Sequence, residues 1–446
     1  MLDQRNTTDQ EKTTTLTELR DRLATTTEPK MKKALQIAIA ELEQSGHPEM
    51  PAGGDARGRV LAAMEAGGMT TQQKDNEPHF TDNALSVLKH RYFLKNDKFQ
   101  VVEDERDMLS RVAKAIAVPD KSYGASDIQV AETESAFYSM IARLEFVPNS
   151  PTLMNAGTDQ GTLSACFVLP LEDSMTGIMK TATDIAMVQK FGGGTGVPLS
   201  NLRQKGSHIS TTHGKACGPI AVLKHLSSVS TMITQGGKRD GANMAVMSVH
   251  HPDIEEFINC KAQEGDIHNF NISVGATDAF MNAVKDGGTV DSIDPSTNEV
   301  VESKDARNLF NLIVEGAWRN GEPGMIFIDE VNRKQPAPHL GEMEATNPCG
   351  EQPLLPYESC NLGSINLTKM LKYGLEGTEI DWDRLRHTVQ TATHFLDNTI
   401  DANGYSVPEI KRMNMLTRKI GLGVMGFADM LVRLGIPYDS EEGVEI

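Results

Sequence analysis

The sequence predicts an α/β protein built on a parallel β-sheet that is either open or closed into a barrel. Two observations predict this fold class. Beyond residue 147, short apolar runs alternate along the chain with helical patterns such as Ile178, Ala182, Ile185 and Val188. The runs are apolar at successive positions rather than at every second one, which is typical of strands buried on both faces. The predicted strands lie at residues 165–169, 244–249, 272–274, 325–328 and 420–424.

An α-helical region is predicted before the sheet. Thr81 is a good N-cap for a first helix, and further helical patterns follow at residues 108–116 and around 136–144. Residues 1–79 contain many Thr, charged and amide side chains with short helical patterns, and they are typical of a disordered tail. The apolar face of the first helix carries Leu85, Leu88, Tyr92 and Phe93. The predicted domains are a tail at 1–79, a helical domain at 80–147 and an α/β barrel at 148–446.

Composition excludes several classes of protein. The 446 residues include 43 Lys and Arg against 61 Asp and Glu, a net charge of −18, which opposes binding to nucleic acid or to an anionic membrane. No apolar run reaches the length of a transmembrane helix, and the polar amino terminus lacks the apolar core of a secretory signal, so we expect a cytoplasmic protein. The five cysteines contain no C-x-x-C pair, which argues against a disulfide framework and a metal site. Trp318 and Trp382 are expected in the core.

The segment Asn347-Pro348-Cys349-Gly350-Glu351 is the strongest candidate for chemistry. Alternate residues of an extended segment point the same way, so Asn347, Cys349 and Glu351 can present an amide, a thiol and a carboxylate to one pocket. The alternative is a Pro/Gly turn in which Cys349 is a small buried residue and Glu351 a solvated acid. A zinc site is disfavoured, because the nearest histidine, His339, has no suitably spaced partner.

Four further motifs accompany this segment in the same chain. Taken together and in this order, the motifs resemble those of the large catalytic subunit of ribonucleotide reductase, most closely the adenosylcobalamin-dependent class II enzymes. They are NSPTLMNAG at 149–157, LSACFVL at 163–169, KFGGGTG at 190–196 and GGKRDGAN at 236–243. The resemblance runs from about residue 80 to 446 and implies a ten-stranded α/β barrel. Family members continue past Ile446, so the barrel is expected to be incomplete here, as a truncated chain or one completed by a second polypeptide.

The resemblance implies catalytic roles for five residues. Cys349 would carry a thiyl radical that takes the 3′-hydrogen of a ribonucleotide, Glu351 would be the general base, and Asn347 would orient the substrate hydroxyls. Cys166 and Cys360 would be the reducing pair, which supplies two electrons and ends as a disulfide. The remaining two cysteines, which match no role and are predicted to be buried packing residues, are Cys217 and Cys260.

The resemblance also implies two nucleotide sites. At the effector site, Asp173 would bind the sugar while Lys190 and Arg203 bind phosphates, although a helix start and surface charges are the alternative reading. The loop 236–243 would relay the effector's identity to the substrate site. The glycine run 192–196 lacks the pattern of a phosphate-binding loop and, alone, predicts a tight turn. The substrate site would be lined by Ser150, Ala165, Cys166, Gly194, Asn347 and Glu351.

The function that follows from the resemblance is reduction of ribonucleotides, with diphosphates expected, to deoxyribonucleotides. Adenosylcobalamin would generate the radical that oxidises Cys349. ATP or deoxynucleoside triphosphates would act as effectors, a thioredoxin-like protein as reductant, and the chain would form a homodimer. Two alternatives remain open: a class I large subunit, whose radical arrives from a separate metal-containing subunit, and a non-catalytic nucleotide-binding subunit.

Overall fold

The computed structural model describes residues 77–446 except 79, 160, 236–238, 264, 266 and 375–376. The predicted tail at 1–79 therefore lies outside the described residues, apart from Glu77 and Pro78. The larger of two compact units contains Pro78–Met370 and Trp382–Phe427, and a smaller one contains Leu371–Asp381 and Ala428–Ile446. Among the described residues, no helix combines the length and the apolar character needed to cross a bilayer.

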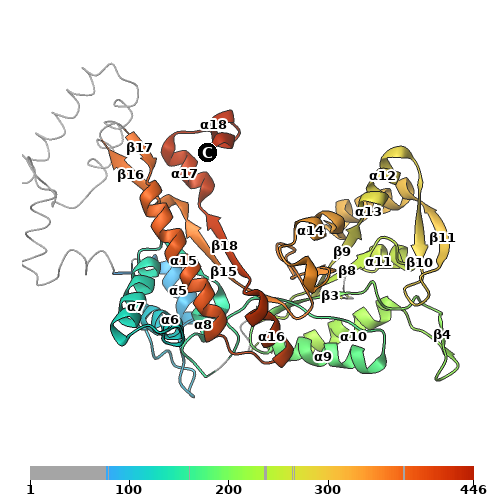
Figure 1. Cartoon of the computed structure of the whole chain (residues 1–446), viewed down its shortest axis with the longest axis horizontal. Coiled ribbons are helices and arrows are strands. Elements are labelled where there is room, and N and C mark those ends of the chain that lie inside the picture. Colours follow the sequence, from blue (N-terminus) through green and yellow to red (C-terminus); the bar gives the residue numbers. More distant parts are fainter. Residues whose placement is uncertain are drawn as a thin grey trace, which may run out of the picture. The chain divides into compact units, whose positions relative to one another are not determined.

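A series of five parallel strands forms the first part of the main sheet (Figure 1). A helix separates each strand from the next along the chain, which confirms the predicted α/β class. In spatial order the strands are β2 (Cys166–Val168), β3 (Gly194–Pro198), β8 (Asn243–Ser248), β9 (Phe270–Ala276) and β12 (Gly324–Phe327). The connecting helices are α9 (Met175–Gln189), α10 (Pro219–Met232), α11 (Ile254–Asn259), α12 (Asp278–Asp286) and α13 (Ala306–Asn320).

The strand β15 (Ser359–Asn366) joins this series to the rest of the sheet. One edge of β15 pairs antiparallel with β2 and then with β1 (Phe146–Pro148), and its other edge pairs parallel with β18 (Ile420–Met425). The helices α15 (Trp382–Ala402) and α16 (Pro408–Thr417) connect β15 to β18. The described residues thus form an eight-stranded sheet that curls as part of a barrel, where the resemblance implies ten strands.

The helices at the amino-terminal end of the larger unit follow the predicted pattern. The hydroxyl of Thr81 accepts a hydrogen bond from the backbone of Ala84 at 3.2 Å, so Thr81 is the expected N-cap. Arg111 pairs with Glu103 and donates to the carbonyl of Ala156, which fixes the segment after α8. These helices are α5 (Asp82–Arg91), α6 (Glu105–Ala117), the 3₁₀ helix η1 (Val118–Tyr123), α7 (Asp127–Ala142) and α8 (Ser150–Asn155).

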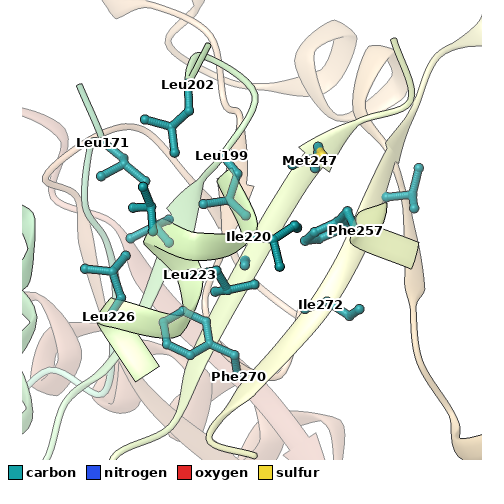
Figure 2. Close-up of a cluster of buried hydrophobic side chains, with 14 of the residues drawn as sticks. Leu171, Leu199, Leu202, Ile220, Leu223, Leu226, Met247, Phe257, Phe270 and Ile272 are labelled. Atoms are coloured by element: carbon teal, nitrogen blue, oxygen red, sulfur yellow. The ribbon is translucent and has the colours of Figure 1, made fainter. Parts of the chain in front are cut away.

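Side chains alternate between the two faces of the sheet, and each face has its own apolar cluster. On β8, Met247 belongs to the larger cluster, where Leu223 and Leu226 of α10 pack over the strands (Figure 2). Met244 and Val246 belong to a smaller cluster on the opposite face, which we call the inner face. That inner cluster consists of Cys166, Val168, Met244, Val246, Ala345, Leu354 and Cys360.

The prediction that the two tryptophans lie in the core was wrong. Trp318 is 88% exposed because α13 buries the opposite side, including Ile313, and Trp382 at the start of α15 is 61% exposed. The larger unit also contains β4 (His208–Ile209), β5 (Gly214–Lys215), β6 (Thr234–Gln235), β7 (Arg239–Asp240), β10 (Thr289–Ile293), β11 (Val300–Asp305), α14 (Ile328–Lys334), η2 (Pro338–Leu340) and η3 (Leu367–Lys369). The smaller unit contains the hairpin β16 (Leu371–Gly374) and β17 (Gly377–Ile380), and α18 (Glu441–Glu445), while α17 (Phe427–Leu434) begins at the last residue of the larger unit.

Candidate active site

A short hairpin carries the Asn-Pro-Cys-Gly-Glu segment. Its strands are β13 (Ala345–Thr346) and β14 (Pro353–Leu354), and residues 347–352 form its turn. The side-chain oxygen of Asn347 accepts a hydrogen bond from the backbone of Gln352 at 2.9 Å, while the Asn347 backbone donates to the Gln352 carbonyl. Gly350 has φ +84°, a conformation that glycine adopts without strain. The turn is thus closed by Asn347 itself, with Cys349 and Glu351 exposed on it.

The hairpin lies directly on the inner face of the sheet. A Cβ atom on Gly196 would lie 1.7 Å from the carbonyl oxygen of Thr346, and one on Gly194 would lie 2.7 Å from Cγ of Pro348. The side-chain amide of Asn271 on β9 donates to the Pro348 carbonyl at 2.6 Å. The glycine run predicted as a turn is therefore a turn only at Gly192. From Gly194 onward the chain is strand β3, and because its glycines have no side chains, the backbone of the hairpin can approach closely.

The side chains of Asn347, Cys166 and Glu351 meet where the hairpin crosses β2. The Asn347 amide donates to Sγ of Cys166 at 3.1 Å, and this thiol in turn donates to Oε1 of Glu351 at 3.6 Å. Asn347 is buried, whereas Glu351 is exposed. The hairpin therefore brings an amide and a carboxylate to the buried thiol, and it carries a second thiol, Cys349, on the same turn. The alternative in which Cys349 is a buried residue is wrong.

Cys166 and Cys360 are direct partners in the antiparallel pairing of β2 with β15. Such partners have Cα atoms about 4.5–5.5 Å apart, within the range that a disulfide spans. Both cysteines are free thiols and both are buried. Burial, followed by the nearby Glu351 carboxylate, raises the pKa of Cys166 far above its ordinary value, and burial raises the pKa of Cys360 to about 12. Both residues are therefore held as protonated thiols.

The other two cysteines lie elsewhere. Cys217 is exposed, so its prediction as a buried packing residue was wrong. It lies immediately before the glycine that begins α10, outside the apolar face of that helix. Cys260 is partly buried and packs against the larger apolar cluster, as predicted.

Of the other residues expected to line the substrate, Gly194 lies against the hairpin, Ala165 is next to Cys166, and Ser150 has a different contact. Gly194 donates a backbone hydrogen bond to the carbonyl of Ala165 at 2.8 Å, and Ala165 donates to the carbonyl of Cys360. Ser150 begins α8 directly after β1, and its hydroxyl lies 2.8 Å from that of Tyr92. Tyr92 was predicted only on the apolar face of a helix, so its polar contact with Ser150 was missed.

The three residues expected to bind an effector divide into two groups. The guanidinium of Arg203 donates from Nε to the Asp173 carboxylate at 2.7 Å. Asp173 lies just before α9, whereas Lys190 caps the carboxyl end of that helix and is exposed. A 15-residue helix is about 22 Å long. Within one chain, Lys190 therefore does not reach the ligand space beside Asp173 and Arg203.

The expected relay loop at 236–243 is described only in part. Residues 236–238 lie outside the described residues, while β6 and β7 pair on either side of them. After the loop, the Asn243 side-chain oxygen accepts hydrogen bonds from Gln189 on α9 and from Thr195 on β3. The end of the loop is therefore tied to the helix that carries Asp173 and Lys190 at its two ends.

Two models of protein domains match the chain. The model described as the ribonucleotide reductase barrel domain matches residues 164–446, and the all-alpha domain of the same enzyme matches residues 78–161. The match to the barrel domain covers more than half of the chain. Together with the curled sheet and the hairpin on its inner face, it identifies the class of protein: the chain belongs to the ribonucleotide reductase large-subunit family.

Individual relatives refine this assignment. The chain is 44% identical over 420 residues to the vitamin B12-dependent ribonucleoside-diphosphate reductase of Thermoplasma acidophilum, covering 82% of this chain and 54% of that protein. It is 46% identical over 365 residues to the enzyme of the same name in Mycobacterium tuberculosis, covering 81% and 52%. It is also 31% identical to a ribonucleoside-diphosphate reductase subunit alpha of Chlamydia muridarum, covering 82% and 37%. The chain therefore spans about half the length of the vitamin B12-dependent relatives it matches.

Proposed function

We propose that this chain supplies the catalytic thiols of a vitamin B12-dependent ribonucleotide reductase that converts ribonucleoside diphosphates to 2′-deoxyribonucleotides in the cytoplasm. The observation that carries the proposal is the contact of Asn347 and Glu351 with Cys166, on the turn that also exposes Cys349. Family membership and the names of the relatives support the reaction. The chain covers about half the length of those relatives.

The proposed reaction uses each residue of the site in turn. A thiyl radical on Cys349 takes the 3′-hydrogen of the ribose, and the Glu351 carboxylate accepts the 3′-hydroxyl proton while Asn347 orients the hydroxyl groups. The 2′-oxygen leaves as water with a proton from Cys166. C2′ then takes the thiol hydrogen of Cys360, and the sulfur atoms of Cys166 and Cys360 join as a disulfide and pass the second electron to the 3′-ketone, whose oxygen takes back the proton from Glu351. Cys349 finally returns the hydrogen to C3′, which regenerates its thiyl radical. Because Cys166 is held protonated, it can act as the acid in this sequence.

Adenosylcobalamin would supply the hydrogen-abstracting carbon radical that oxidises a thiol. The exposed position of Cys349 fits this chemistry, because a buried thiol would not be reached by an external radical. The remaining steps depend only on protein side chains and substrate. An external dithiol of the thioredoxin type would restore Cys166 and Cys360.

The decisive experiment is to assay the chain with adenosylcobalamin, a ribonucleoside diphosphate and excess dithiothreitol, with and without the carboxy-terminal half of the Thermoplasma relative. We expect deoxyribonucleotide formation that depends on the cobalamin and on the added half. Product formed with a separate metal-containing subunit in place of cobalamin would favour a class I enzyme. Binding of nucleotides without any product under either condition would favour a non-catalytic subunit.

Effector control would require a homodimer. Asp173 and Lys190 are separated by the length of α9, so one effector can meet both only if two copies place their α9 helices side by side in opposite directions, as a two-fold axis does. The exposed surface of α9 supports this arrangement. It carries Met175 and Met179, which are 75% and 49% exposed and lie one turn apart on the same side of the helix. ATP and deoxynucleoside triphosphates would bind at this interface.

Replacing Asp173 by alanine should weaken effector binding about tenfold, the effect of losing one charge-assisted hydrogen bond. Calorimetric titration of the chain with deoxynucleoside triphosphates measures this, and product ratios in the completed enzyme should lose their dependence on effector while basal reduction persists. Glu256→Ala is the control, because it also removes the carboxylate of an ion pair, here the more exposed pair with Lys205. Unchanged affinity and selectivity in Asp173→Ala would reject this effector site.

A further inference from the structure

A buried ion pair lies beside Cys360 and has no part in the mechanism above. The ammonium of Lys419 contacts Oε2 of Glu358, and their side chains are 12% and 0% exposed. Oε2 of Glu358 also accepts a hydrogen bond from the backbone of Leu355, whereas its Oε1 is buried and has no hydrogen-bond partner in the described part of the chain. Removing two charges from water costs free energy that a solvent-exposed pair does not pay, so stability alone does not account for this pair.

The surrounding backbone holds this pair rigidly. Arg418 adopts φ +46° at the end of α16, a conformation that is uncommon for residues other than glycine, and so directs the chain into β18. Its guanidinium binds both Asp397 and Asp401 on α15. On the other strand, the side chain of Asn414 forms two hydrogen bonds with Ser359, between Glu358 and Cys360. The positions of Lys419 and Glu358 are therefore set by contacts on both sides.

The sulfur of Cys360 lies on the same side as this pair. A Cβ atom on Gly421 would lie 3.2 Å from Sγ of Cys360, so the thiol points toward β18. Glu358 immediately precedes β15 and Lys419 immediately precedes β18, so their ion pair lies beside the point where β15 begins to pair with β18, the strand toward which the thiol points. The Lys419 ammonium lowers the pKa of Cys360, against the larger effect of burial and the opposing effects of Glu351 and Glu358.

The two sulfur atoms of the redox pair therefore differ in their surroundings. Cys166 contacts the exposed side chain of Glu351 and faces the hairpin turn. Cys360 is fully buried, donates its thiol hydrogen to the carbonyl of Asn361, and has the cation of Lys419 nearby. Both cysteines are buried, but Cys166 is 4% exposed and Cys360 0%, so we expect an incoming nucleophile to attack Cys166 and the sulfur of Cys360 to leave.

We propose that Lys419, held in place by Glu358, is a positioning residue for re-reduction of the Cys166–Cys360 disulfide, where its ammonium stabilises Cys360 as the leaving thiolate. The proposal rests on the proposed function, which makes these cysteines the redox pair. A thiolate of an external dithiol attacks Sγ of Cys166, a new disulfide forms to that sulfur, and the electron pair of the broken bond stays on Cys360. The second thiol of the reductant then releases Cys166, the reductant ends as a disulfide, and two protons restore both thiols.

The test measures disulfide reduction in the chain as it stands, without turnover. The oxidised chain is mixed with dithiothreitol between pH 7 and 9, and free thiols are followed by alkylation and peptide mass spectrometry. We expect Lys419→Met to slow reduction roughly tenfold, because the rate depends on the acidity of the leaving thiol, and Lys419→Arg to restore it. Glu358→Gln should change the rate in the opposite direction, since it leaves the ammonium unopposed. Lys411→Met, on the exposed side of α16, is the matched control.

Three outcomes separate the possibilities. Equal reduction rates in wild type, Lys419→Met and Glu358→Gln would overturn the role of Lys419, as would trapping of a monothiol adduct on Cys360 rather than on Cys166. Failure of the wild-type chain to form the Cys166–Cys360 disulfide at all would instead reject the redox pair of the proposed function. If Lys419→Met alone does not fold, Lys419→Met/Glu358→Gln removes both charges together, and we expect it to reduce as slowly as a chain lacking the cation.

Discussion

Replacing Cys349 by serine should reduce deoxyribonucleotide formation by the completed enzyme to below detection. An O–H bond is much stronger than an S–H bond, so serine cannot hold the radical that takes the 3′-hydrogen. The side chain is exposed on the turn, so the substitution should leave the fold, the midpoint of thermal unfolding and nucleotide binding unchanged. Turnover is measured with cobalamin, substrate and excess dithiothreitol, and binding by calorimetry on the same preparation.

Cys217→Ser is the matched control for this experiment, because Cys217 is also exposed and lies outside the site. It should retain the wild-type rate. Turnover by Cys349→Ser at even a tenth of that rate would refute the radical role of Cys349. Loss of nucleotide binding along with turnover would show instead that the turn was disrupted, and the radical role would then be tested with Cys349→Ala.

Replacing Gly196 by alanine should displace the hairpin or unfold the sheet around it. The new Cβ would lie 1.7 Å from the Thr346 carbonyl oxygen, and a backbone atom cannot move aside as a flexible side chain does. We expect a loss of at least about 3 kcal/mol in the free energy of unfolding, the upper end of the usual cost of overpacking. Denaturant unfolding measures this loss, and alkylation of Cys166 and Cys360 should become much faster as the hairpin moves away.

Gly275→Ala provides the comparison for Gly196. It lies on β9 of the same sheet, and its Cβ would meet its nearest neighbours at 3.7 Å, an ordinary van der Waals distance. This variant should keep nearly wild-type stability and protected thiols. Wild-type stability and protected thiols in Gly196→Ala would mean that the hairpin does not lie against β3 as described.

Strands and helices with continuous or periodic apolar residues could be predicted from sequence. Each of the five apolar runs overlaps one of the strands β2, β8, β9, β12 and β18. The strands β3 and β15 were missed as strands. One is rich in glycine and the other in polar residues, because the hairpin and neighbouring backbones pack closely against them. The composition of these two strands reflects tertiary contacts, which cannot be deduced from the local sequence pattern.

The candidate site could be predicted in part. Asn347 and Glu351 were expected to share a pocket because alternate residues of an extended segment point the same way. Both side chains contact Cys166, but they do so from a turn with Gly350 at φ +84°, so the alternation of an extended segment does not explain the contact. The pairing of Cys166 with Cys360 depends on strands far apart in sequence, and only the resemblance suggested it. The contribution of Lys419 had no local signal, because its position is set by a left-handed residue and by contacts with two other elements.

The register of β2 with β15 has a consequence for the stability of the protein at each stage of the proposed cycle. A disulfide between Cys166 and Cys360 would join two neighbouring strands and close a very long covalent loop. Closing such a loop raises the free energy of the unfolded chain by about 5 kcal/mol. The disulfide form that remains after each turnover would therefore be more stable than the dithiol form. Each reduction of the disulfide would restore the two thiols and at the same time lower the free energy of unfolding. The reduced form would then depend on its noncovalent contacts for stability.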